Sequence, residues 1–249
     1  MNNRAIAFYL GSAYCLSLLL FSQFIRLPES AESLTWLFAS LVLVTGPAIF
    51  MLPALLVFWF SGRPHHPEAR IGGRWVLLIW LLSALVNLFL FADAKLFDLY
   101  GFHINGFVIN LMMTPGGIQS LGASDGAYLM SGVFGTGIFL LHLLLLKTSE
   151  RISHWQFPLS GRQLMSAMVL LLVVEKGIYA WSDLENYGPV LNQAAAVPLY
   201  KGVTARKMAG KLGYKAPDRH EVQLGNTGTE LNYPLAPLQL SPPPKRPNL

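Results

Sequence analysis

The chain has 249 residues, of which 53% are hydrophobic and 12% are charged, whereas an ordinary soluble domain carries about 25% charged residues. Together with a mean hydropathy of +0.45, this composition predicts a membrane protein and argues against a soluble globular domain. The formal net charge of +5 does not indicate a nucleic-acid partner, because the basic residues flank hydrophobic segments. The lone cysteine, Cys15, excludes an intramolecular disulfide and a cysteine-based metal cluster.

Five hydrophobic runs are long enough to cross a bilayer, whose hydrocarbon core of about 30 Å requires about 20 apolar residues as helix. They cover approximately residues 5–25, 34–60, 75–92, 127–146 and 164–181. The first run exceeds the 7 to 15 residues, roughly, of a signal-peptide core, so we expect it to remain as a helix. The sequence therefore predicts an all-α membrane protein whose transmembrane domain spans residues 1–181.

The basic residues near the span ends gather on one side of the predicted bundle. That side carries Arg4, Arg63, Arg70, Arg74, Lys147, Arg151 and Arg162. The loops of the other side offer Arg26 and Lys95, accompanied by several acidic residues. Because lysine and arginine are retained on the cytoplasmic side, we expect a cytoplasmic N-terminus and, after five spans, a C-terminus on the outer side.

The segment 93–126, between the third and fourth spans, is too polar to cross the membrane. Its apolar residues Leu96, Tyr100, Ile104, Phe107 and Leu111 follow helical spacing. This pattern predicts an amphipathic helix at the membrane interface, although Gly101 and Gly106 weaken it. A turn at residues 114–117 ends the pattern.

The tail changes character after residue 181, because no further run is long enough to span a membrane. Residues 182–231 are expected to form a periplasmic juxtamembrane segment, with one short basic helix within 201–212. Residues 232–249 are rich in proline and are typical of an extended linker, which we expect to lead to a domain absent from this sequence.

Two charged residues, Glu175 and Lys176, lie inside the fifth span, where an uncompensated charge costs a few kcal/mol. Neighbouring residues point about 100° apart on a helix, so they need not pair with each other. Two interpretations remain open: the side chains anchor the helix by reaching toward headgroups, or they bind a headgroup or a partner.

Other polar residues also have two interpretations. His103, Asn105 and Asn110 could bind a lipid phosphate or a neighbouring loop, or could satisfy backbone groups of an irregular segment. No catalytic motif and no metal-binding spacing is present. A channel or small transporter would need polar residues in several spans, and only Asn87, Glu175 and Lys176 are conspicuous.

Several motifs resemble the membrane domain of the YejM/PbgA-like sulfatase family of bacterial inner-membrane proteins. The longest is DAKLFDLYGFHINGFVINL at residues 93–111, followed by TPGGIQSLG at 114–122. Shorter ones are EKGIYAWSD at 175–183, VPLY at 197–200 and LNYPL at 231–235.

The resemblance implies a multi-pass inner-membrane domain that precedes a periplasmic domain of the alkaline-phosphatase superfamily, related to phosphoethanolamine and phosphoglycerol transferases. Such a domain would hold the divalent metal and the nucleophile; this chain has neither, so it is not catalytic by itself and needs no cofactor. The implied role is envelope-lipid homeostasis, with lipopolysaccharide or cardiolipin and other inner-membrane proteins as partners. Lipid or domain contacts are then expected at His103, Asn105, Asn110, Glu175, Lys176 and Asp183. The alternative is a stand-alone membrane sensor without catalysis.

Overall fold

The computed structural model describes residues 1–28, 30–61, 69–117, 125–152, 154 and 160–217. These residues form eight α-helices and one short 3-10 helix, which confirms the predicted all-α class. Five of the helices are long and apolar enough to cross a membrane. The chain divides into two units, residues 1–205 and 206–249.

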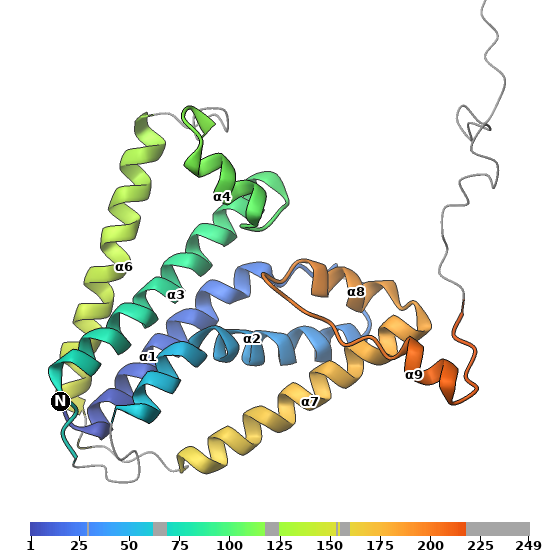
Figure 1. The fold of residues 1–249 in the computed structure, drawn as a ribbon, viewed down its shortest axis with the longest axis horizontal. Coiled ribbons are helices and arrows are strands. Elements are labelled where there is room, and N and C mark those ends of the chain that lie inside the picture. Colours follow the sequence, from blue (N-terminus) through green and yellow to red (C-terminus); the bar gives the residue numbers. More distant parts are fainter. Residues whose placement is uncertain (29, 62–68, 118–124, 153, 155–159, 218–249) are drawn as a thin grey trace, which may run out of the picture. The chain divides into compact units, whose positions relative to one another are not determined.

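Three long helices form the centre of the first unit: α1 (Asn3–Phe21), α2 (Ser33–Phe60) and α3 (Gly73–Tyr100), and each contacts the other two. A 3-10 turn (Ser22–Phe24) extends α1. Figure 1 shows this central group in blue to teal. The helices approach closely at Gly46 of α2, where a Cβ atom would overlap the ring of Phe21. Two proline residues inside α2, Pro47 and Pro53, do not end the helix, because neighbouring helices can satisfy freed backbone groups in a membrane.

Two hydrophobic cores lie at the two ends of this group. One end holds Ile6, Tyr9, Leu10, Ala13, Met51, Ala54, Ile71 and Ile79. The other holds Phe21, Phe24, Phe38, Val42, Leu90, Ala94, Val190, Ala194 and Val197. We call them the N-end core and the far-end core. At the N-end, the backbone of Asn2 pairs with that of Arg70, so the chain start lies beside the beginning of α3.

The last two long helices lie at the edges of the group. Helix α6 (Asp125–Ile152) contacts α1 and α3, and α7 (Gly161–Glu185) contacts α2. Only 6% of the most apolar window of each helix is buried within the protein. Most of their apolar side chains therefore face lipid or another protein. Few apolar contacts hold each of these two helices to the centre.

The predicted interfacial segment is divided differently from the sequence-based expectation. Helix α3 runs eight residues beyond Ala92 to Tyr100, where Gly101 adopts a left-handed conformation with φ 74° and ends it. A separate short helix, α4 (Gly106–Met113), follows. The single amphipathic helix predicted over 95–113 is therefore split into the end of α3 and α4, because a left-handed residue cannot continue a right-handed helix. Residues 118–124 lie outside the described residues.

The segment after α7 contains a helix that the sequence analysis did not predict, α8 (Gly188–Ala195), which packs on α2 and α7. The far-end core therefore extends past the expected boundary at residue 181. In the second unit, the expected basic helix is present but short, as α9 (Arg206–Lys211). The proposed linker, residues 232–249, lies outside the described residues.

Candidate functional site

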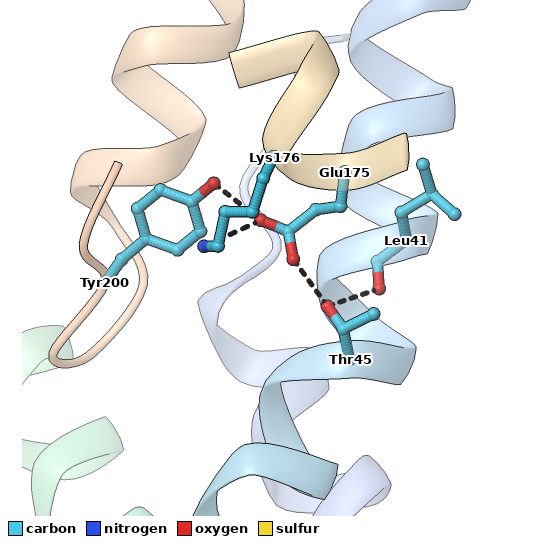
Figure 2. A network of polar contacts seen from close by, with 5 residues as sticks. All are labelled: Leu41, Thr45, Glu175, Lys176 and Tyr200. Carbon is cyan, nitrogen blue, oxygen red and sulfur yellow. Dashed lines mark hydrogen bonds and ion pairs between the residues drawn. The ribbon is translucent and has the colours of Figure 1, made fainter. Parts of the chain in front are cut away.

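The carboxylate of Glu175 is the centre of a buried polar group in the far-end half of the protein. Glu175 lies on α7 and is 1% exposed, so it points into the protein and not toward headgroups. Thr45 of α2 donates to its Oε2 at 2.8 Å, while also lying 3.0 Å from the carbonyl oxygen of Leu41. Figure 2 shows this carboxylate between α2 and the chain segment that follows α8.

Two further donors reach the other carboxylate oxygen. The Tyr200 hydroxyl donates to Oε1 at 2.6 Å, and the Lys176 ammonium lies 3.0 Å from the same atom. Lys176 Nζ also lies 3.7 Å from the centre of the Tyr200 ring, a cation–π contact. The two adjacent charges on α7 therefore do pair, although helix geometry alone did not require it. The long lysine side chain bends to the carboxylate, which compensates the charge within the span.

Tyr200 occupies its position because of the backbone before and after it. Leu199 has φ 53°, a left-handed conformation that is uncommon for a residue with a branched side chain. Gly202 lies so close to Tyr179 of α7 that a Cβ atom would overlap the ring. Burial raises the pKa of the Tyr200 hydroxyl above its ordinary value, and the hydrogen bond to Glu175 and its negative charge raise it further. Tyr200 therefore stays a hydrogen-bond donor.

The contacts of Glu175 suit a structural connection between helices more than a catalytic role. The Glu175 carboxylate receives two hydroxyl donors and an ammonium group, so its lone pairs are largely occupied. Within the described residues, no group of three or more His, Cys, Asp or Glu side chains could hold a metal ion. We call Thr45, Glu175, Lys176 and Tyr200 the Glu175 tie, because they join α2, α7 and the segment after α8.

A second buried polar group joins α6 to the centre. His142 of α6 is 0% exposed. Its Nδ1 lies 2.8 Å from the Tyr9 hydroxyl, and its Nε2 lies 3.0 Å from Asn87 Nδ2. Ser17 donates to Asn87 Oδ1 at 2.6 Å, and Tyr9 reaches the carbonyl oxygen of Trp80 at 3.3 Å. One consistent assignment has neutral His142 accepting from Asn87 and donating to Tyr9.

This His142 tie was missed in the sequence analysis, apart from Asn87. His142 interrupts an otherwise apolar run in the fourth span, and an ionisable residue there was a signal that could have found it. The polar residues on α1, α3 and α6 would suit a transporter. They bond mainly to one another, however, which favours a structural connection between helices.

His103 takes part in a separate polar contact near the end of α3. His103 Nδ1 lies 2.7 Å from Oδ2 of Asp93, which is fully buried, and the His103 ring stacks on Phe97 with centres 4.4 Å apart. Asp93 Oδ1 also accepts from the Ile104 backbone. His103 and Asp93 therefore fix the turn between α3 and α4.

Two predicted residues have local roles, and a third is buried. Asn105 accepts from the backbone N–H groups of Phe107 and Val108 and so caps α4. Asn110 is exposed on α4, and Asp183 is buried near the end of α7.

Gln193 of α8 is a buried residue that the sequence analysis did not identify. Its Nε2 donates to the Phe24 carbonyl at 3.0 Å, and its Oε1 accepts from the Arg26 backbone at 3.1 Å. Two bonds from one side chain thus fix the chain as it leaves α1. The contact spans more than 160 residues in sequence, so no local pattern could have predicted it.

Comparison with known proteins decides the family. A family model described as a domain of unknown function, DUF3413, matches residues 1–240. The chain belongs to the DUF3413 family. An uncharacterized protein of Haemophilus influenzae is 23% identical over 259 aligned positions, which cover 99% of this chain. The chain spans about 40% of the length of that relative. That relative is therefore considerably longer than the part that this chain matches.

Proposed function

We propose that this DUF3413 domain is the membrane anchor and lipid-proximal regulatory domain of a sulfatase-like envelope protein. The Glu175 tie is the observation that carries the proposal. It connects two spanning helices to residues 197–205, the segment that lies between the membrane helices and the second unit of the chain. A change in the packing of α7 would thereby alter the conformation of residues 197–205.

The proposal also draws on length and resemblance. The relative from Haemophilus influenzae is considerably longer than the part that matches, which leaves room for another domain. The motifs at 93–111 and 175–183 resemble the membrane part of sulfatase-like proteins, and the second of these contains Glu175 and Lys176. In the proposed protein the additional domain is periplasmic and related to phosphoethanolamine or phosphoglycerol transferases.

An apolar groove beside Glu175 supports the proposal that this part of the domain contacts lipid. The neighbouring residues Val174, Gly177, Ile178 and Trp181 line a shallow apolar groove of about 490 Å³ together with Leu34 of α2. A lipid chain or a hydrophobic segment in this groove would press on α7 one residue from the carboxylate. We propose that lipid composition, with lipopolysaccharide or cardiolipin as candidates, is sensed through this pressure on α7.

Orientation is the first part of the proposal to test. A reporter enzyme that is active only outside the cytoplasm, fused after residue 217, should be active, and one that works only in the cytoplasm should be silent. The reverse pattern would contradict the periplasmic position of the C-terminal segment.

Function is tested in a Gram-negative strain that lacks its own member of the family. The full-length protein should restore the ratio of lipopolysaccharide to phospholipid and resistance to large antibiotics. Glu175→Ala, which removes every bond to the carboxylate, should restore neither, while Glu175→Gln, which keeps an acceptor for Tyr200, should restore both in part. Full restoration by Glu175→Ala at equal protein level would refute the regulatory role. It would favour a domain that only anchors the protein in the membrane.

A further inference from the structure

A second shallow groove lies between α3 and α6 at the N-end of the protein. Its volume is about 460 Å³, and most of its lining is apolar. The walls include Ile71, Val76, Leu77, Trp80, Leu143 and Leu146. Figure 1 marks the N-terminus close to the beginning of α3 and to the end of α6. The groove is thus at the edge of a spanning segment and is open to the surface that faces lipid.

The chain around this groove is basic. Among the described residues of the two flanking stretches, 69–74 and 147–152, four are basic and one is acidic. Arg74 follows the lining residue Gly73, and Lys147 follows the lining residue Leu146. Both side chains belong to exposed residues. A phosphate group above the groove would meet positive charge from both helices.

The groove beside Glu175 provides a contrast within the same protein. It has a similar volume and a mostly apolar lining, but the chain beside its lining residues carries acids, with Glu32 two residues before Leu34 and Asp183 two residues after Trp181. The basic stretches 69–74 and 147–152 therefore distinguish the groove between α3 and α6 from the one beside Glu175.

We propose that the groove between α3 and α6 binds an anionic phospholipid of the adjacent leaflet. One acyl chain lies against Val76, Leu77 and Leu143, and the phosphate lies near Arg74 and Lys147. Apolar area gives affinity for any phospholipid, while each nearby basic residue favours an anionic lipid by about a factor of five. This inference does not depend on the proposed regulatory function.

The test is native mass spectrometry of the whole protein with dioleoylphosphatidylglycerol or dioleoylphosphatidylcholine. We expect the wild-type protein to retain the anionic lipid preferentially. The double variant Arg74→Gln with Lys147→Gln should lose this preference by about 25-fold. Arg162→Gln, which removes an exposed charge away from the groove lining, should keep it. Equal retention of the two lipids by wild type, or an unchanged preference in the double variant, would overturn the proposal.

A second pair of variants tests the groove itself. Leu77 lines the groove and is 61% exposed, so Leu77→Trp should fold and should weaken retention of both lipids. Leu85 is 44% exposed on the same helix and does not line the groove, so Leu85→Trp should have no effect. Equal effects of the two variants would contradict a defined groove site.

A competition experiment separates a bound lipid from a bound phosphate. Soluble glycerol phosphate shares the headgroup chemistry but has no acyl chain, so it should not displace dioleoylphosphatidylglycerol. Complete displacement at equal concentration would show a simple phosphate site and overturn the assignment to a lipid.

Discussion

Helices α6 and α7 are both peripheral, yet each is held to the centre in a different way. On α6, His142 joins Tyr9 and Asn87 of the two neighbouring helices, and all its bonds stay among spanning helices. On α7, Glu175 joins Thr45 of α2 but also Tyr200, outside the spans. His142 therefore fixes a helix within the bundle, whereas Glu175 fixes a helix and also the chain beyond it.

The two ties differ in charge as well. The His142 tie is consistent with neutral donors and acceptors throughout. The Glu175 tie contains a carboxylate and an ammonium group 3.0 Å apart. Removing one member of a charged pair leaves the other uncompensated, which is costly in a medium of low dielectric constant. We therefore expect both helices to be sensitive to lost hydrogen bonds, and α7 to be sensitive also to lost charge.

The largest effect is expected for His142→Leu. The change removes two hydrogen bonds between helices, so Tyr9 and Asn87 each lose one of their partners. Bonds of this kind contribute about 0.6 to 2 kcal/mol each in membrane proteins, so the free energy of unfolding should fall by about 2 to 3 kcal/mol. Unfolding in mixed detergent micelles measures it. His154→Leu, at an exposed position beyond α6, should change little; equal losses would contradict a tie at His142.

Glu175→Ala should destabilise the protein by about 2 kcal/mol, because it removes three contacts but allows Lys176 to turn toward water. Glu175→Gln should cost less, since an amide oxygen still accepts from Tyr200. Thermal unfolding of the two variants in the same detergent gives the comparison. If Glu175→Gln is as damaging as Glu175→Ala, charge and not hydrogen bonding dominates the tie.

Tyr200→Phe removes one hydroxyl and keeps the ring against Phe38 and Lys176, so a loss of about 1 kcal/mol is expected. The pKa of Tyr200 is raised in the folded protein. Its contribution is therefore complete below the unfolded pKa of about 10 and is lost only as pH rises through the higher folded value. The difference between wild type and Tyr200→Phe should stay constant from neutral pH to about 10. A difference that disappears below that pH would argue against the buried hydroxyl.

The smallest effect is expected for Ser17→Ala. Ser17 donates to Asn87 at the edge of the His142 tie, and the average bond between spanning helices contributes about 0.6 kcal/mol. The same micelle unfolding experiment applies. Thr148→Ala is a suitable control, because Thr148 is exposed on α6 and donates to the Leu144 carbonyl of its own helix. A loss in Ser17→Ala no larger than in this control would remove Ser17 from the tie.

The spanning helices were predictable because a run of apolar residues is a local signal. The five predicted spans all occur, and the structure lengthens the third, fourth and fifth ones, as in α3, which continues through the polar residues Asp93 and Lys95 to Tyr100. A boundary predicted from hydropathy lies where the apolar run ends, whereas the helix itself continues until a residue such as Gly101 stops it.

The candidate site was only half predictable. A charge inside a span identified Glu175, but its partner Thr45 lies 130 residues away in sequence. Tyr200 is nearer in sequence, yet its contact depends on the left-handed backbone at Leu199, for which no residue such as glycine gave a signal. Packing of α8 and the bonds of Gln193 likewise arise only from the tertiary structure.

Hydrogen exchange of the backbone at residues 199–205 tests the central claim most directly, that Glu175 connects the spanning helices to the segment after α8. Exchange is to be compared in the wild-type protein, Glu175→Ala and His142→Leu, in the same detergent. We predict faster exchange at 199–205 in Glu175→Ala and unchanged exchange there in His142→Leu. Unchanged exchange in Glu175→Ala, or an equal increase in both variants, would contradict the claim.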